Sequence, residues 1–472
     1  MDVALFIAHT PTFLTELKIY SRFLVSKEIA MPVFVIAYEP SLSTSFQEEC
    51  QSKGVECRNA ATFKAQTKGL LGKFYWLRIC SIDRVFALIF FGLIAWVAGV
   101  QRNFFRDVHL FNKSTDQIRS MLQEIKPAYL ILGGDMPGYD SALYIKEAKK
   151  RGIRSFIIPS TMSNGKEQAE IYLPDSQYHA AVTSHKILAL FFKKWSKEYR
   201  EILLFRVPIS RLLAIKFFKI EVEKPWVFNS TNADIVFLES LAMRDYYSAV
   251  GLDANNLVVT GAPTSDLIYE VGANLNGIKT RLRTKYCLDR YQKVVLLALP
   301  PDFFYVVGGR PQSNYANHAE VINFFSHLIG AHQSVRWIIS LHPSMTKSDY
   351  GALELAGATI IDEPAYQLLP LCDIYLATVS STIRWAIACG VPVINYDFYR
   401  YRYDHFESVD GVLYAATEEV FDLLLNALLE QVDFLQRIKE QQQLSSFRWG
   451  LLDGKCCERI NEEIQQRLNS KH

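Results

Sequence analysis

The sequence predicts an α/β protein with two doubly wound halves, each a parallel sheet covered by helices. Short, continuously apolar, β-branched segments alternate with segments of helical length and periodicity, as buried parallel strands alternate with crossover helices. Two such series follow one another along the chain. In addition, 472 residues are too many for one ordinary core. Two domains joined near Gly261, Ala262 and Pro263 account for all three observations.

The predicted strands form two series in chain order. The first series is Val3–Ala8, Val33–Ala37, Tyr129–Leu132, Ser155–Ile158, Ile235–Leu238 and Leu257–Thr260. The second series is Val294–Leu299, Trp337–Leu341, Thr359–Ile361, Ile374–Ala377 and Val393–Tyr396. Crossover helices are expected between the strands, for example over Tyr139–Arg151 and His318–Gly330.

Composition and charge exclude several classes of protein. A net charge of +2 argues against a nucleic-acid-binding protein. The eight cysteines include no CxxC pair and no zinc-like spacing, which favours a reducing compartment and no structural zinc. Residues 1–8, MDVALFIA, have neither a basic n-region nor a small-residue cleavage site. We therefore expect them to form the first strand rather than a targeting signal.

Two segments of the first half depart from the strand–helix alternation. Val85–Val100 is apolar, with Arg84, Arg102 and Arg106 beside it and aromatic residues nearby. A helix of this length spans about 24 Å, less than a ~30 Å hydrocarbon core, so we expect it at a membrane interface or buried in the core. Residues 186–224 mix basic and apolar side chains, which predicts either a basic amphipathic helix on a membrane surface or an ordinary core-facing helix.

Several motifs occur in an order that resembles GT-B-type nucleotide-sugar enzymes. They are ADIVFLESLAMRDYYSAVG and VVTGAPTSD within residues 230–270, then ISLHPS, IIDEPAYQLLPLCDIYLATVSST and ACGVPVINY. The resemblance covers roughly residues 120–180 and 230–400. It implies two Rossmann-like domains facing across a cleft. These are an acceptor domain (1–262) and a donor domain (263–440). The apolar and basic segments are expected to form membrane-associating insertions in the first domain, at about 64–115 and 185–226, and residues 441–472 a C-terminal helical tail.

Two polar strand ends of the second half are the expected donor site. Ser380, Ser381 and Thr382 lie between a strand and a helix, where backbone N–H groups and hydroxyls can bind phosphate; a simple helix cap is the alternative. His342 and Pro343 follow an earlier strand, and the imidazole could donate to a phosphate oxygen or simply belong to a loop.

The same resemblance suggests a base pocket and a class of donor. It places Glu363 and Tyr366 on the loop that lines the base pocket. His-Pro followed by Ser-Ser-Thr is similar to enzymes that use CMP-activated sugars, such as bacterial sialyl- and Kdo transferases, and to CDP-glycerol polymerases.

The candidate chemical carboxylate is Asp135, which follows two glycines at a strand end of the first half. Such a carboxylate could be a general base for an acceptor hydroxyl, or a nucleophile in a retaining reaction; a turn-forming aspartate is the alternative. Asp140 is the second choice. His9, after the first strand, and Ser160 with Thr161, after another, could line the acceptor side.

One departure from the GT-B pattern bears on the reaction. Many GT-B enzymes and the UDP-GlcNAc 2-epimerases carry glutamate in the helix after the small-residue loop. Here that helix contains Arg384 and Trp385, which disfavours the epimerase, and Arg384 could be a phosphate or carboxylate ligand or a surface residue. No DxD motif follows a strand, so metal-independent transfer without a cofactor is expected.

Together these features predict a glycosyltransferase of cell-surface polysaccharide or lipid-linked glycan synthesis, such as that of capsule or lipopolysaccharide in bacteria. Its donor would be a nucleotide-activated sugar, with cytidine favoured, and its acceptor a lipid-linked or glycan molecule. It would be cytoplasmic and peripheral on the inner face of the cell membrane, and would bind no nucleic acid. The alternatives are a CDP-glycerol or polyol-phosphate transferase, an enzyme like UDP-GlcNAc 2-epimerase, and a non-catalytic scaffold.

Overall fold

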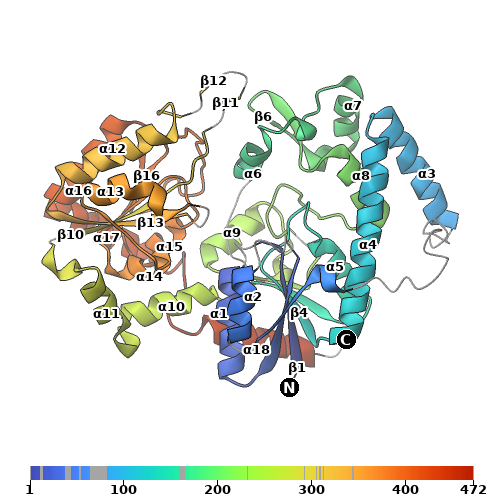
Figure 1. The fold of residues 1–472 in the computed structure, drawn as a ribbon, viewed down its shortest axis with the longest axis horizontal. Helices are drawn as coiled ribbons and strands as arrows, with labels where there is room; N and C mark the ends of the chain where they lie inside the picture. Colours follow the sequence, from blue (N-terminus) through green and yellow to red (C-terminus); the bar gives the residue numbers. More distant parts are fainter. Residues whose placement is uncertain are drawn as a thin grey trace. The chain divides into compact units, whose positions relative to one another are not determined.

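The computed structural model divides the chain into two compact units, which are described separately (Figure 1). Unit 1 comprises Met1–Phe237, Tyr247–Val258 and Glu462–His472, and unit 2 comprises Leu238–Tyr246 and Val259–Asn461. The structure describes residues 2–10, 14–37, 44–52, 55–63, 82–158, 165–230, 232–291, 293–304, 306–307, 310–311, 313–342 and 345–470.

The sheet of unit 1 has seven strands in the order β3-β2-β1-β4-β5-β8-β9. The strands are β1 (Asp2–Ala8), β2 (Ala30–Ile36), β3 (Glu56–Asn59), β4 (Tyr129–Leu132), β5 (Arg154–Ile157), β8 (Ile235–Leu238) and β9 (Leu257–Val259). β1 pairs in parallel with β2 on one side and β4 on the other. The strand order therefore changes direction between β1 and β4, and ligands of open α/β sheets bind at the carboxyl ends of strands at such a point.

Helices cover this sheet, and an additional subdomain is inserted in the second part of the unit. The helices are α1 (Leu14–Ser26), α2 (Thr44–Ser52), α3 (Ile82–Val97), α4 (Gln101–Ile125), α5 (Ser141–Lys149), α6 (Gly165–Tyr172), α7 (Thr183–Phe191) and α8 (Ile209–Phe218). An antiparallel hairpin, β6 (Ser196–Tyr199) with β7 (Ile202–Phe205), lies between α7 and α8. The long helix α4 packs against α3, α5 and α8.

Unit 2 repeats the doubly wound pattern with six parallel strands in the order β14-β13-β10-β15-β16-β17. They are β10 (Lys293–Leu299), β13 (Val335–Leu341), β14 (Thr359–Ile360), β15 (Ile374–Ala377), β16 (Val393–Tyr396) and β17 (Val412–Ala415). The helices are α10 (Pro263–Gly272), α11 (Ile278–Lys285), α12 (His318–Ala331), α13 (Gly351–Leu355), α14 (Ala365–Leu368), α15 (Ile383–Ala388), α16 (Glu418–Glu430) and α17 (Val432–Ser446). Two further helices, α9 (Leu241–Ala249) and α18 (Cys456–Asn469), begin in unit 2 and end in unit 1. A small ribbon, β11 (Val306–Val307) with β12 (Arg310–Pro311), follows β10. Buried aliphatic and aromatic side chains of the sheet pack against α12 and α16.

The predicted α/β class with two parallel sheets is confirmed. Each predicted strand occurs, with its ends shifted by at most three residues. The edge strands β3 and β17 were not predicted. β3, ECRN, is a short, largely polar and partly exposed sequence, and β17, VLYA, is a four-residue strand that is partly exposed although apolar.

The expectation of one basic helix across residues 186–224 is wrong. Arg200 and Glu201 have φ values of 48° and 64°, which turn the chain into the hairpin β6–β7. Pro208 then precedes α8, whose apolar side chains are largely buried.

The alternative of a buried helix for Val85–Val100 is also wrong, because α3 exposes one full side. No helix formed by the described residues is long and apolar enough to cross a membrane.

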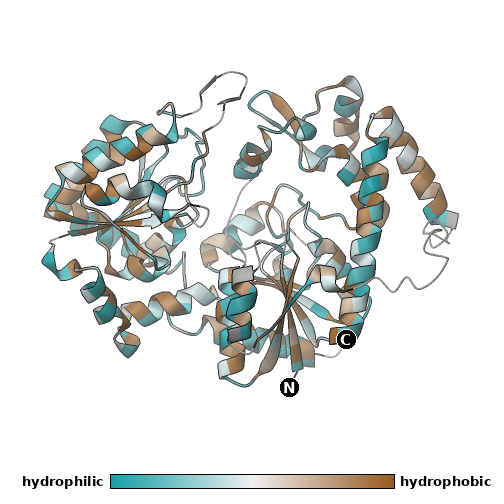
Figure 2. Cartoon of the chain, viewed as in Figure 1, coloured by the Kyte–Doolittle hydropathy of each residue, from teal (hydrophilic) through white to brown (hydrophobic). Residues whose placement is uncertain are grey.

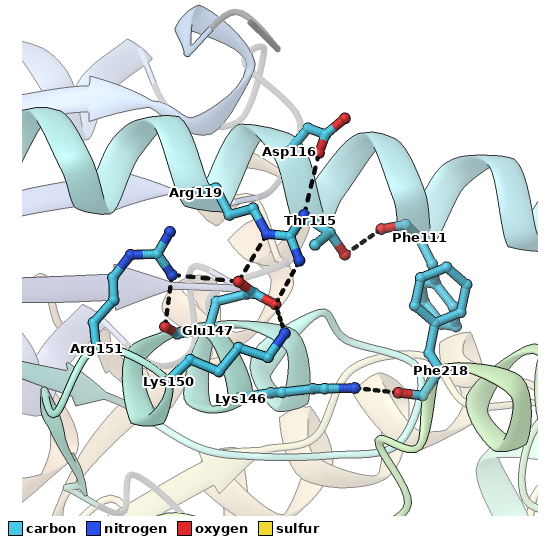
Figure 3. A network of polar contacts seen from close by, with 9 residues as sticks. All are labelled: Phe111, Thr115, Asp116, Arg119, Lys146, Glu147, Lys150, Arg151 and Phe218. Carbon is cyan, nitrogen blue, oxygen red and sulfur yellow. Dashed lines mark hydrogen bonds and ion pairs between the residues drawn. The ribbon is translucent and has the colours of Figure 1, made fainter. Parts of the chain in front are cut away.

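A polar cluster fastens α5 to α4 beneath the carboxyl edge of the unit 1 sheet (Figure 3). The buried carboxylate of Glu147 accepts hydrogen bonds from Arg119 at 2.9 Å, from Lys150, and from Arg151 at 3.3 Å. Burial alone would raise the pKa of Glu147, but the hydrogen bonds and charges of Arg119 and Lys150 outweigh it and lower the pKa to about 2. Lys146 donates to the carbonyl of Phe218, which ties α5 to α8 as well.

We predict that Glu147→Gln lowers the unfolding free energy of unit 1 by about 2 kcal/mol at pH 7. Because the pKa of Glu147 is lower in the folded protein, its contribution is complete above pH ~4.5 and is lost as the pH falls toward ~2. Chemical denaturation at several pH values measures this difference. Glu354→Gln, which removes a partner from an exposed ion pair with Lys347, should cost less than about 1 kcal/mol. Equal losses for the two variants, or a Glu147 effect independent of pH, would contradict this account.

Candidate functional site

The carboxyl ends of β13, β10 and β15 bring together the polar loops of unit 2. β10 pairs with β13 on one side and β15 on the other, so this is where the strand order changes direction. Neighbouring strands are about 4.8 Å apart, so the loops after β13 and β15 leave the sheet about 10 Å from each other. His342 follows β13, and Ser380, Ser381 and Thr382 follow β15.

The Ser380–Thr382 loop has an internal hydrogen-bond network. Ser380 Oγ and Thr382 Oγ1 are 2.7 Å apart, and Thr382 Oγ1 also contacts the hydroxyl of Tyr375. The Thr382 amide donates to Ser380 Oγ at 3.2 Å. Among the described residues, the Ser381 hydroxyl and the backbone N–H groups of Ser380 and Ser381 have no partner. Three donors therefore remain available, and successive backbone N–H groups of this kind bind anions.

Val379 places this loop in a strained conformation. Its φ of 42° lies in the left-handed region, which a β-branched residue rarely adopts. The Val379 amide donates at 2.8 Å to Oδ1 of the buried Asn395 of β16, and this bond holds the conformation. Strain of this kind, of order 1–3 kcal/mol, is typical of functional loops.

Arg384 holds the Ser380–Thr382 loop in place through a hydrogen bond. Its guanidinium forms a buried ion pair with Glu239, and its Nη1 donates to the Ser381 carbonyl at 2.7 Å. The expectation that Arg384 is a surface residue is therefore wrong, since only 3% of it is exposed. Its charge is compensated by Glu239, so its role in the structure is to position Ser381.

The helix after the loop is short. α15 has six residues, and its N-cap Thr382 makes no side-chain capping bond. A helix this short has a weak macrodipole, so the loop donors matter more here than the helix terminus.

The other predicted donor-site residues are placed as follows. His342 is largely exposed, and desolvation of its ring lowers the pKa, so the neutral form predominates at pH 7. Glu363 accepts hydrogen bonds from Lys285 at 2.7 Å and from Tyr286. Tyr366 is buried and packs edge-on against Trp385. Pro343, Ser160 and Thr161 lie outside the described residues.

A series of stacked aromatic side chains follows β16, the strand beside β15, and was not predicted from the sequence. Tyr399, Tyr401 and Tyr403 follow β16 and stack in succession, with ring centroids 5.2 Å apart. The Tyr399 hydroxyl donates at 2.9 Å to the carbonyl of Pro301, which follows β10. Since β10 and β16 flank β15, this bond crosses the carboxyl end of β15. The alternating YRYRY of residues 399–403 was the available signal.

Unit 1 places His9 and Asp135 at its own change of strand order, after β1 and β4. Both are buried. Burial lowers the pKa of His9 to about 4, against a smaller opposing effect of Asp140, so His9 is neutral at pH 7. Asp135 accepts a hydrogen bond from the Ser141 hydroxyl, and its amide donates to Asn229 at 2.8 Å. These bonds shape the loop between β4 and α5.

Asp140 lines a cavity of about 260 Å³ at the same edge of the sheet. The polar walls also include Asn59, Lys113, Ser114 and Gln117. Asp140 is partly exposed and lies 3.2 Å from a guanidinium nitrogen of Arg211. The cavity also borders Tyr144, whose ring meets that of His9 edge-on at 5.6 Å. Asp140 is therefore the carboxylate that a bound molecule could reach.

Among the residues that the structure describes, one cluster has ligand atoms close enough for a metal ion: Asp266, Asp453 and Cys456. Its carboxylates already have partners. Asp266 accepts from the amides of Cys456 and Cys457 at 2.8 and 2.9 Å, and Asp453 pairs with Arg459. Burial also raises the pKa of the Cys456 thiol, which disfavours the thiolate. The cluster is explained as the cap of α18.

Comparison with solved structures identifies the fold. No protein-family model and no curated protein matches the chain. The S. aureus MnaA–UDP structure aligns with a TM-score of 0.52 at 13% identity, covering 99% of this chain and 97% of the other. The Neisseria meningitidis UDP-GlcNAc 2-epimerase bound to UDP-GlcNAc gives 0.53 at 11%, covering 99% and 100%. A glycotransferase of kitacinnamycin gives 0.50 at 11%, covering 98% and 99%. The chain therefore has the GT-B-like fold of nucleotide-sugar enzymes.

We predict that Arg384→Met lowers the unfolding free energy of unit 2 by about 3 kcal/mol, because it leaves Glu239 buried and unpaired. The double variant Arg384→Met with Glu239→Met should recover most of this loss. Arg448→Met, which breaks an exposed pair with Asp245, should cost less than about 1 kcal/mol. Urea denaturation measures all three. A double variant that is as unstable as the sum of its single substitutions would contradict the pairing.

Proposed function

We propose that this protein is a metal-independent glycosyltransferase that moves a sugar from a nucleotide-activated donor to a lipid-linked or glycan acceptor. The observation that carries the proposal is the Ser380–Thr382 loop, with three open donors at the strand-order change of unit 2. A phosphate of the donor would accept hydrogen bonds from these groups, which remain fixed during the reaction because Arg384 and Asn395 hold the loop. His342 would add a neutral hydrogen bond.

Two observations bear on which nucleotide base the donor carries, and they favour different bases. The order of His342-Pro343 and Ser-Ser-Thr favours a cytidine nucleotide, through its similarity to CMP- and CDP-dependent enzymes. The UDP and UDP-GlcNAc complexes among the similar structures favour uridine. We retain cytidine as the first choice and test both. Transfer of glycerol phosphate or a polyol phosphate from a CDP donor would use the same phosphate contacts.

The acceptor site is assigned to the cavity of unit 1 beside Asp140. A general base must reach the proton that it removes, and the partly exposed Asp140 meets this condition. Asp135 would then position the β4–α5 loop through Ser141, and His9 would pack behind Tyr144. If Asp135 is itself the base, as its place after two glycines suggests, the loop must move to expose it.

Epimerisation of a sugar nucleotide is the second candidate, because several similar structures are UDP-GlcNAc 2-epimerases. Against it, α15 presents Arg384 and Trp385 and no carboxylate. Incubation of the purified protein with CMP-Kdo, CMP-sialic acid, CDP-glycerol and UDP-GlcNAc separates the candidates. Nucleotide release supports transfer, whereas solvent deuterium entering the sugar of UDP-GlcNAc supports epimerisation. If neither occurs and no cytidine or uridine nucleotide raises the melting temperature, the donor-site proposal fails.

We predict that Ser381→Ala weakens binding of the donor nucleotide about tenfold, the value of one hydrogen bond to a charged group. Calorimetric titration with CDP and UDP measures it. Ser446→Ala, which changes a partly exposed serine of α17, is the control and should leave affinity unchanged. Unchanged affinity in Ser381→Ala would place the phosphate elsewhere.

We also predict that Asp140→Asn lowers kcat by about 10²-fold or more and changes donor KM little, because a general base acts in the chemical step. Asp135→Asn should instead lower thermal stability along with activity. The two steady-state constants and the melting temperature of each variant decide the assignment. Full activity of Asp140→Asn, with a folded but inactive Asp135→Asn, would transfer the base role to Asp135.

A further inference from the structure

Helix α3 presents a row of large apolar side chains to solvent. The exposed residues are Val85, Phe86, Ile89, Phe90, Leu93, Trp96 and Val97, which recur every three or four positions and so share one side of the helix. Between 47% and 66% of each residue is accessible. Isolated exposed apolar residues are ordinary, but a continuous row of this size marks an interaction surface.

The opposite side of α3 is built for close packing. Gly92, Ala95 and Ala98 are buried where α3 packs against α4 and α8. An added Cβ at Gly92 would lie 3.5 Å from the Phe105 ring, an ordinary contact distance, so α3 and α4 approach each other closely at this position. Figure 1 shows α3 lying beside α4, and Figure 2 shows much more brown on α3 than on α4. A helix that covers a core turns its large apolar side chains inward, whereas α3 turns its small residues inward and its large apolar residues toward solvent.

Helix α7 extends this surface. Its Ile187, Leu190 and Phe191 are exposed, the last to 78%. A ring nitrogen of His185 lies 3.0 Å from the carbonyl oxygen of Ala98, which joins α7 to the end of α3. We call the exposed apolar residues of α3 and α7 together the apolar face.

Positive charges border the apolar face. Arg84 precedes its α3 row, Arg102 and Arg106 follow that row, and Lys186 and Lys193 accompany α7. All five side chains are exposed, and within the part of the chain that the structure describes no side-chain hydrogen bond or ion pair involves them. The acidic residues of the same segments are the exposed Asp83 and the buried Asp107, which accepts from Ser210.

We infer that the apolar face binds an anionic lipid bilayer, with α3 lying in the plane of the interface. Exposed aromatic and aliphatic side chains would enter the headgroup boundary, and the basic border would attract anionic headgroups. A second copy fits less well, because a two-fold contact would bring the two basic borders together. The inference does not depend on the sugar-nucleotide reaction.

Membrane binding would also bring a lipid-linked acceptor near the candidate acceptor cavity, a consequence that rests on the proposed function. The cavity beside Asp140 is lined by Lys113, Ser114 and Gln117 of α4, and α3 packs on the same helix. From Arg106 to Lys113 the rise along α4 is about 10 Å. A bilayer at the apolar face would therefore bring a lipid-linked acceptor close to this cavity.

The test is sedimentation of the full chain with phosphatidylcholine vesicles, with and without phosphatidylglycerol, in the absence of any sugar nucleotide. We expect binding to the anionic vesicles that weakens as salt rises. The triple variant Phe86→Glu, Phe90→Glu, Trp96→Glu should lose about a hundredfold or more in partition coefficient, since three apolar side chains no longer insert. The control Leu355→Glu, Leu423→Glu, Leu444→Glu adds the same charge at apolar residues of unit 2 that are even more exposed, and it should bind normally.

A second measurement keeps the test valid if the triple variant misfolds. Trp96→Phe should still bind, and quenching of tryptophan fluorescence by brominated lipid should be smaller than in the unaltered protein. Normal binding by a folded triple variant would overturn the inference, as would equal binding to neutral vesicles. Self-association that the triple variant abolishes, without vesicle binding by the unaltered protein, would also overturn it and assign the face to a second copy.

Discussion

The parallel pairing of β10 with β13 on one side and β15 on the other is the constraint on which the donor-site account depends. Because β13 and β15 lie on opposite sides of β10, the loops that follow these two strands leave the same edge of the sheet on either side of β10. The candidate donor-site residues His342 and Ser381 follow β13 and β15. Unit 1 repeats the constraint with β1, β2 and β4, which places His9 and Asp135 at its own edge. Each unit thus gathers polar loops at one edge for a topological reason.

The strand order brings the loops together, but buried polar contacts determine which hydrogen-bond donors of these loops remain available to a ligand. In unit 2 the ion pair of Arg384 with Glu239 and the bond from Val379 to Asn395 hold the Ser380–Thr382 loop in a strained form. The network uses the hydroxyls of Ser380 and Thr382 internally and leaves other donors open. Such preorganisation lowers the cost of binding an anion, because the donors need not be ordered first.

The sequence predicted those parts of the fold whose signal is local. Buried strands such as Ile374–Ala377 are continuously apolar, so even their ends were correct. The hairpin β6–β7 was missed because left-handed turn residues Arg200 and Glu201 are not typical of such turns. The partnership of Arg384 with Glu239 spans 145 positions, and only the folded chain brings the two together. The sequence ranked Asp135 above Asp140 because Asp135 follows two glycines, and only the folded chain shows that Asp135 is buried whereas Asp140 is partly exposed.

The most direct test of the central claim follows the amide protons of the Ser380–Thr382 loop. Hydrogen–deuterium exchange of the full chain, with and without CMP, CDP or UDP, reports whether these N–H groups gain an acceptor. The account predicts that a nucleotide slows exchange in the peptide containing Ser380 and Ser381, and that the segment after β13 is protected with it. Binding of a nucleotide that leaves this loop exchanging at its original rate, while another region becomes protected, would contradict it.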